Sequence, residues 1–173
     1  PNNDMNNARQ YVDKFFTYAT PHDGIEMAGV NVPSWLSLAD MDNFNRKEMA
    51  RYLDLEKEYS KTKSVAWIPE DLFPPDRIFC MVGSNRMDYE VAKGLSRTFA
   101  GHGSDGLVRI ENATLSGIKA DGTPGTPCAK AFAFRSHSGF YGIVNSEEAY
   151  QNLTRFLFGD VRVDLWRDVE EIH

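Results

Sequence analysis

The sequence lacks several features that would assign a protein to a functional class at once. Only two cysteines, Cys80 and Cys128, occur in 173 residues, and no Cys-x-x-Cys pair or Cys/His spacing typical of a metal site exists. The 19 Lys and Arg against 25 Asp and Glu give a net charge of −6, and the basic residues are scattered singly, which disfavours nucleic-acid binding. No apolar stretch reaches the roughly 18 residues of a membrane span, although contact with a membrane surface stays open. We expect no cofactor and no metal, and the compartment is not indicated.

Two turns rich in Ser and Gly each contain one titratable residue beside an apolar run. The first is Gly103-Ser104-Asp105-Gly106, and the second is Ser136-His137-Ser138-Gly139, which places His137 32 residues after Asp105. An Asp and then a His, each at the end of a strand, is the chain order of the last two members of an α/β-hydrolase triad. The first member, a Ser in Gly-x-Ser-x-Gly, does not occur in the sequence.

Asp105 and His137 are therefore the candidate catalytic residues. A hydrolytic His takes a proton from the nucleophile and delivers it to the leaving group, and the small neighbours of His137 leave room for a substrate. Asp105 would hold the imidazole tautomer and stabilise the imidazolium. The plainer alternatives are an exposed loop His and a turn Asp that bonds its own backbone, since Asp-Gly is a common turn pair. The pairing of the two at this spacing favours the catalytic interpretation.

Other polar residues are weaker candidates. His22, in a Thr-Pro-His-Asp-Gly turn, is expected to be structural and to line a pocket, and His102 is expected to lie in a solvated loop. Ser84 ends an apolar run as a nucleophile would, but it lacks the second Gly of a sharp elbow. Cys80 lies within the apolar run Ile78–Val82 and is expected to be a buried free thiol.

Short apolar runs predict the strands of an α/β fold with a mostly parallel sheet. They cover residues 12–19, 78–82, 107–110 and 131–134. The run 78–82 has no polar residue apart from Cys80, which is typical of a strand buried on both faces of a parallel sheet. Gly and Pro predict a loop at 121–127.

Two segments have helical spacing of apolar residues. The first, from about Met41 to Tyr59, is dense in charge, and prolines close it, so that residues 26–75 are interpreted as a cap-like or lid-like insertion. Trp35 and Trp67 flank this insertion; core packing is the default role for them, and lining an acyl-chain pocket is the alternative. The second helix follows Ser146, an N-cap residue, and is expected to end at Gly159.

Several segments together resemble lipase-like and esterase-like α/β hydrolases, of the broad lipase and GPI-inositol-deacylase-like group. Residues 16–24 resemble the strand and Thr-Pro-His-x-Gly turn found just downstream of the nucleophile helix. Residues 104–108 resemble the acid loop, residues 136–139 the histidine loop, and residues 145–159 the helix that follows that histidine. The resemblance spans about residues 9–160.

The resemblance implies that residues 1–173 are the C-terminal part of a single α/β-hydrolase domain. It implies carboxylic-ester hydrolysis on an ester or lipid substrate through an acyl-enzyme, with Asp105 as the acid and His137 as the general base. The Ser and the oxyanion hole would lie outside this chain, in an N-terminal half of the same fold. Because removal of one oxyanion donor alone costs on the order of 10²–10³ in rate, we expect these 173 residues to be inactive by themselves.

Other functions remain open on the same scaffold, because a fold does not fix a substrate. One is a catalytically inactive binding module that keeps the hydrolase fold. Another is a phospholipase-type effector acting on membrane lipids. An acyltransferase or a thioesterase is a further alternative.

Overall fold

The structure, a computed structural model, describes residues 8–27, 30–31, 44–86, 103–161 and 163, and its architecture is mixed α/β. Its main sheet contains β1 (Phe15–Tyr18), β5 (Ile78–Gly83) and β8 (Ala129–Ala133). A second sheet contains β4 (Trp67–Pro69), β6 (Ser116–Ile118) and β7 (Pro124–Pro127). The α-helices are α1 (Arg46–Tyr52), α2 (Glu56–Thr62) and α4 (Glu147–Phe158). The short pieces are β2 (Glu26–Met27), β3 (Val30–Asn31), η1 (Ala8–Tyr11), η3 (Pro75–Arg77), η5 (Glu111–Ala113) and η6 (Ile143–Asn145).

The main sheet has the order β1-β5-β8, and both of its pairings are parallel. Thr17 pairs with Cys80 in one ladder, and Phe79 pairs with Ala129 in the other. The carboxyl ends of all three strands therefore meet at one edge of the sheet. The loops that leave this edge contain His22, Ser84 and His137.

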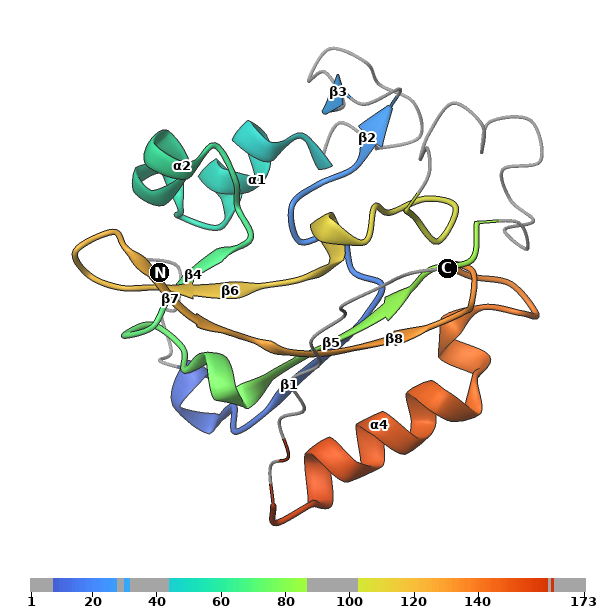
Figure 1. The fold of residues 1–173 in the computed structure, drawn as a ribbon. Helices are drawn as coiled ribbons and strands as arrows, with labels where there is room; N and C mark the ends of the chain where they lie inside the picture. The colour runs from blue at the N-terminus through green and yellow to red at the C-terminus, as the bar shows by residue number, and fades with distance from the viewer. Residues whose placement is uncertain (1–7, 28–29, 32–43, 87–102, 162, 164–173) are drawn as a thin grey trace, which may run out of the picture.

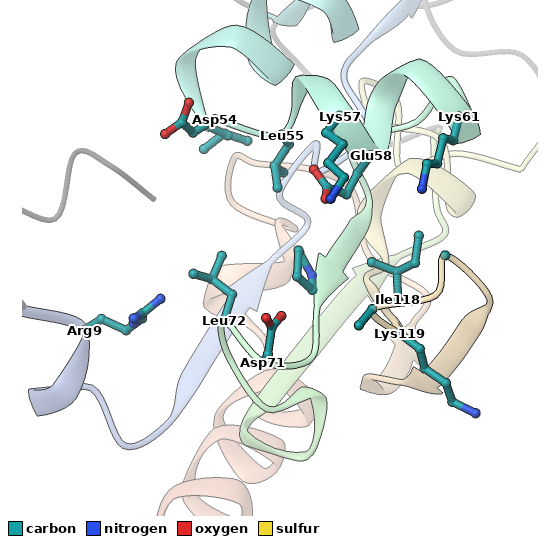
Figure 2. A pocket seen from close by; sticks show the side chains of 14 residues that line it. Arg9, Asp54, Leu55, Lys57, Glu58, Lys61, Asp71, Leu72, Ile118 and Lys119 are labelled. Atoms are coloured by element: carbon teal, nitrogen blue, oxygen red, sulfur yellow. The ribbon is translucent and has the colours of Figure 1, made fainter.

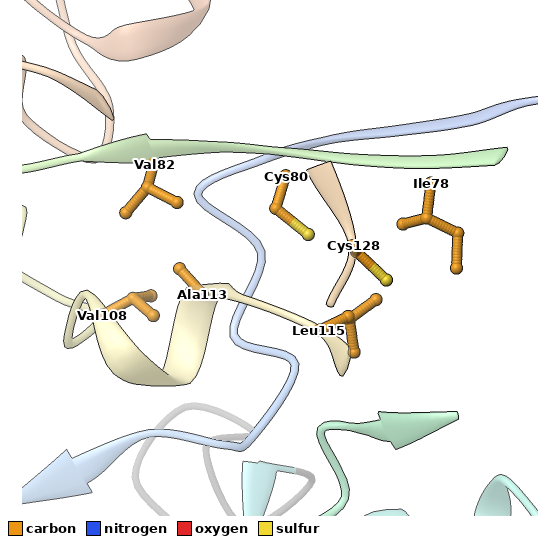
Figure 3. Packing of buried hydrophobic residues seen from close by; sticks show 7 residues of the cluster. All are labelled: Ile78, Cys80, Val82, Val108, Ala113, Leu115 and Cys128. Atoms are coloured by element: carbon orange, nitrogen blue, oxygen red, sulfur yellow. The ribbon is translucent and has the colours of Figure 1, made fainter. Parts of the chain in front are cut away.

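β5 is the centre of the packing because it is buried on both faces. Ile78, Cys80 and Val82 point to one face and pack with Val108, Ala113, Leu115 and Cys128, as Figure 3 shows. Met81 points to the other face, where it packs with Ala133 and with Ala149 of α4. The molecule thus has α4 on one side of the main sheet, and the second sheet and the 103–115 segment on the other (Figure 1). Cys80 is buried and free, as predicted.

α4 begins and ends where the sequence predicts. The Ser146 side chain accepts a hydrogen bond from the Ala149 N–H at 3.2 Å, and Glu147 and Glu148 favour the positive end of the helix dipole. Gly159 ends the helix with φ −77° rather than in a left-handed conformation. A Cβ at this position would overlap the Arg155 carbonyl oxygen, so close approach rather than a positive φ requires the glycine.

Three element predictions are wrong. Residues 107–110 form no strand, because the Leu107 and Val108 N–H groups bind the Asp105 carboxylate instead of a neighbouring strand. The predicted loop at 121–127 contains β7, which pairs with β6 in an antiparallel hairpin. The helix predicted over 41–59 is two helices within its described part.

The break between α1 and α2 has a local cause. Asp54 adopts the left-handed conformation at φ 61°, and the Leu55 N–H returns to the Ala50 carbonyl at 2.8 Å, which closes α1. The insertion predicted at 26–75 contains β2, β3, α1, α2 and β4 within the described residues, while Trp35 lies outside them.

No helix in the described ranges is both long enough and apolar enough to cross a membrane.

Candidate active site

Asp105 and His137 are in contact at the carboxyl edge of the main sheet. Nδ1 of His137 lies 3.0 Å from Oδ2 of Asp105. The Asp105 side chain is 1% exposed, whereas that of His137 is 21% exposed, so the carboxylate is buried and the imidazole reaches the surface. Two residues that lie 32 positions apart in the sequence thus form one unit.

The turn around Asp105 fixes the carboxylate with backbone hydrogen bonds. Oδ1 accepts the N–H groups of Leu107 at 3.1 Å and of Val108 at 2.8 Å. Gly106 has φ 103°, a conformation that side-chain-bearing residues rarely adopt, and it allows the chain to fold back over the carboxylate. Oδ1 therefore accepts the hydrogen bonds of the turn, and Oδ2 faces the imidazole.

His137 is held by its own backbone and by the loop that follows. Its N–H donates to the Asp105 carbonyl at 2.9 Å, in addition to the side-chain contact. The preceding Ser136 is fully buried; its carbonyl accepts the Ile143 N–H at 2.9 Å, and its hydroxyl donates to the Ser138 carbonyl at 3.1 Å. The histidine loop is therefore closed on itself and tied to the acid loop.

Gly83, the last residue of β5, permits the close approach of the acid loop. A Cβ built on Gly83 would lie 2.8 Å from the Cβ of Asp105 and 2.8 Å from the Arg135 carbonyl oxygen. Real Cβ atoms do not make such contacts with backbone, so a larger residue at this position would displace the acid or the histidine loop. Gly83 is a positioning residue that the motif analysis did not identify, although a glycine at a strand end was a signal for close approach.

The contact with Asp105 determines which ring nitrogen of the neutral His137 imidazole carries the hydrogen. A carboxylate only accepts hydrogen bonds, so Nδ1 of His137 is the N–H donor, and Nε2 carries the lone pair. Nε2 is the ring nitrogen remote from Asp105 and is the atom that can accept a proton from a substrate or nucleophile. If it does so, the buried carboxylate stabilises the imidazolium that forms.

His22 has a different environment. Its Nε2 lies 3.1 Å from the Thr17 hydroxyl, and burial lowers the pKa of this imidazole to about 4. It is therefore neutral at physiological pH and poorly suited to proton exchange there. His22 also lies in the wall of an apolar cavity of about 580 Å³ on the β1 side of the fold.

Asp23, the neighbour of His22, joins three segments. Its Oδ1 accepts the Ser64 hydroxyl at 2.8 Å and the Val65 N–H at 2.7 Å, and its Oδ2 pairs with Arg46 of α1 at 3.0 Å. Its N–H donates to the carbonyl of Asn112, which follows the acid loop. The turn after β1 thus connects the inserted helices to the acid loop. Sequence analysis identified this turn as structural but did not identify its partners.

The remaining candidates are not part of this contact. The Ser84 hydroxyl donates to the Ala133 carbonyl at 3.1 Å. His102 lies outside the described residues. Within the part of the chain that the structure describes, no group of three or more His, Cys, Asp or Glu side chains could hold a metal ion.

Comparisons with known proteins place the chain in no family. No protein-family model matches it, no curated protein matches it significantly in sequence, and no solved structure matches it significantly in fold. The interpretation of the site therefore depends on its own geometry and on the motifs.

Proposed function

We propose that this chain contributes the acid and the general base of a serine carboxylic-ester hydrolase of the α/β-hydrolase type. Asp105 is the acid, and His137 is the base. The observation that carries the proposal is the 3.0 Å contact between Oδ2 of Asp105 and Nδ1 of His137, at the carboxyl edge of a parallel sheet. Ligand and catalytic sites of open parallel sheets lie at this edge.

The topology supports the same assignment. The order β1-β5-β8, the acid loop against the end of β5 and the histidine after β8 agree with the last strands of an α/β hydrolase. α4 follows the histidine loop and packs against the face formed by Met81 and Ala133. The position of α4 agrees with the resemblance of residues 136–139 to the histidine loop and of residues 145–159 to the helix that follows it.

In the proposed reaction, a serine hydroxyl attacks the carbonyl carbon of an ester, and Nε2 of His137 takes its proton. The imidazolium, stabilised by Asp105, then gives that proton to the leaving alkoxide as the carbon–oxygen bond breaks, which leaves an acyl-enzyme. Water then attacks the acyl carbon while Nε2 of His137 takes a proton from it. The imidazolium gives that proton to the serine oxygen as the bond between the acyl carbon and that oxygen breaks, which restores the serine and releases the carboxylic acid. Asp105 does not change its own protonation state.

The nucleophile belongs to polypeptide outside residues 1–173 in this proposal. The sequence has no Gly-x-Ser-x-Gly, and among the described residues β1 has β5 as its one strand neighbour. A parallel strand added beside β1 would end at the same edge as the loops of Asp105 and His137. A serine at the end of that strand, with its adjacent backbone N–H groups, would complete the triad and the oxyanion hole.

The second candidate is a binding module that keeps the fold without catalysis. The observation that favours it is the absence of a nucleophile elbow from these 173 residues. The two candidates differ in what His137 does, because a binding module does not need its proton transfer.

Hydrolysis of p-nitrophenyl butyrate by the protein isolated from its natural source tests the proposal. We expect turnover in the wild type and a loss of about 10³-fold or more in kcat for His137→Gln. His22→Gln is the matched control, since it changes a buried histidine that takes no part in the proposed reaction, and we expect its kcat within about twofold of the wild type. A wild type without esterase activity, or a His137→Gln variant that retains it, would overturn the assignment and favour the binding module.

A further inference from the structure

An apolar groove runs along β1 on the side of the main sheet opposite α4. Its volume is about 580 Å³, which lies in the roughly 300–1,000 Å³ range of small-molecule sites. Apolar side chains from four segments line it, among them Phe15, Met49, Ile68, Leu72, Phe73 and Leu115. Phe15 at its margin is 47% exposed, so the groove is open to solvent.

A second, charged pocket of about 420 Å³ lies beneath α2. Figure 2 shows Lys57 and Lys61 extending from α2 toward the pocket and Arg9 at its other end. Among the described residues, no ion pair involves the ammonium group of Lys57 or of Lys61. The charged side chains that line this pocket are four basic ones and three acidic ones: Arg9, Lys57, Lys61 and Lys119, and Asp54, Glu58 and Asp71. The lining therefore has a net positive charge, which favours an anion.

The two cavities adjoin. Arg9, Leu53, Leu55, Pro69 and Leu72 line both of them, so a charged region passes directly into an apolar one. Neither lining includes Asp105 or His137. This combination therefore differs from the proposed active site in both position and chemistry.

We propose that the joined cavities bind a single-chain amphiphile with an anionic head group. The head group lies near Lys57 and Lys61, and the alkyl chain lies in the apolar groove along β1. Two observations favour such an amphiphile over an entirely apolar ligand. They are the charge complementarity and the sharp change from a charged to an apolar lining. The carboxylates of Asp54, Glu58 and Asp71 also line the charged pocket, and they disfavour binding of the anion there.

Isothermal titration calorimetry of the purified chain with decanoate below its critical micelle concentration tests the proposal. We expect one ligand per chain, tighter binding of decanoate than of 1-decanol, and no binding of decyltrimethylammonium. Because a buried methylene contributes about 0.8 kcal/mol, decanoate should bind roughly 15-fold more tightly than octanoate. Decyl phosphate, titrated in parallel, distinguishes a phosphate source of the anion from a carboxylate source.

Two sets of variants separate the head-group contact from the tail contact. Lys57→Gln combined with Lys61→Gln should weaken decanoate binding about five- to tenfold, and Asp71→Asn should strengthen it. Lys47→Gln combined with Lys130→Gln removes the same charge outside both cavities and should change the affinity less than about twofold. Leu72→Trp, at a half-buried position shared by the cavities, should block the alkyl chain.

Equal binding of decanoate and 1-decanol, or an unchanged affinity in the Lys57/Lys61 double variant, would contradict the proposal. The proposal would also be contradicted if the chain is folded, as judged by circular dichroism, but does not bind decanoate. That result would favour a polypeptide as the ligand of the groove. His137→Gln should bind decanoate as the wild type does, so failure of this site and failure of the proposed hydrolase are separate results.

Discussion

The two oxygen atoms of the Asp105 carboxylate have different partners. Oδ1 accepts the N–H groups of Leu107 and Val108 and so shapes the turn, while Oδ2 faces Nδ1 of His137. Because the turn fixes Oδ1, the direction of Oδ2 is set before any substrate arrives. The proposed role of Asp105 as the acid requires such preorganisation.

Asp105→Asn tests whether the contact with Oδ2 determines the tautomer of His137. Asn keeps a carbonyl oxygen for the turn but presents an NH₂ donor to His137, so Nδ1 must become the acceptor and the proton must move to Nε2. We expect nitrogen-15 NMR of the neutral imidazole to report Nδ1–H in the wild type and Nε2–H in the variant. The same tautomer in both proteins would contradict the hydrogen-bond assignment.

His22 makes the stability of the fold depend on pH. Its pKa is about 4 in the folded protein and about 6.5 when unfolded, so the unfolded chain binds more protons between these values. The free energy of unfolding therefore rises with pH. The contribution of the neutral His22 to it is complete above about pH 6.5 and is lost as the pH falls toward 4. We expect the free energy of unfolding to fall about 2 kcal/mol more in the wild type than in His22→Gln between about pH 7.5 and pH 5. Urea titrations measure this difference, and parallel pH profiles would contradict it.

At the scale of elements, the turn after β1 fastens the inserted helices to the acid loop. Asp23 binds Ser64, Val65 and Arg46 at once, and its side chain is 14% exposed. The Asn112 side chain, 2% exposed, adds hydrogen bonds to the Gly24 carbonyl at 3.2 Å and from Arg46 at 3.4 Å. The insertion and the acid loop are therefore coupled through a buried polar network.

Substitutions at Asp23 measure that coupling. Asp23→Asn keeps an acceptor for Ser64 and Val65 but loses the charge opposite Arg46, and we expect it to cost about 1 kcal/mol. Asp23→Ala removes the acceptor of the Ser64 and Val65 donors and the carboxylate that pairs with Arg46, whose guanidinium keeps its hydrogen bonds to the Asp23 carbonyl and to Asn112. We expect it to cost about 2–4 kcal/mol in urea unfolding. Asp13→Asn, which disrupts the exposed pair with Arg77, should cost less than about 0.5 kcal/mol. Equal effects at Asp13 and Asp23 would show that the network does not stabilise the fold.

The elements differ in how far the sequence predicted them. β5 was predicted because a buried parallel strand is continuously apolar. α4 was predicted because its apolar residues recur at helical spacing and because Ser146 and Gly159 mark its ends. β6 and β7 were missed, because Ser116–Ile118 and Pro124–Pro127 have no apolar alternation and are paired through their backbones. Residues 107–110 were assigned to a strand because sequence periodicity does not reveal that a carboxylate takes their N–H groups.

The site itself was predicted in part. Asp105 and His137 were identified by their turns and their order, and the structure places them in contact. Gly83 and the Asp23 network were not identified, because their roles depend on approaches between residues far apart in the sequence. The catalytic role of the pair stays a prediction.

At the scale of the whole molecule, the three-stranded parallel sheet positions Asp105 and His137 in contact, and the sequence contains no Gly-x-Ser-x-Gly motif. Among the described residues β1 is an edge of this sheet, and in our proposal a further strand beside it brings a serine to the same end of the sheet. The groove along β1 and the pocket beneath α2 lie on the face opposite α4 and do not include the acid–base pair. The proposed ester hydrolysis and the proposed binding of an anionic amphiphile therefore involve separate sites, and each has its own test.

The most direct test of the central proposal is labelling of the natural protein with a fluorophosphonate probe, followed by mapping of the modified residue by mass spectrometry. This chemistry marks a serine that a neighbouring histidine activates. We predict one labelled serine outside residues 1–173, and loss of that label in His137→Ala. Labelling that survives His137→Ala, a labelled serine within residues 1–173, or no labelling of the folded protein would contradict the assignment of Asp105 and His137 as the acid and base of a serine hydrolase.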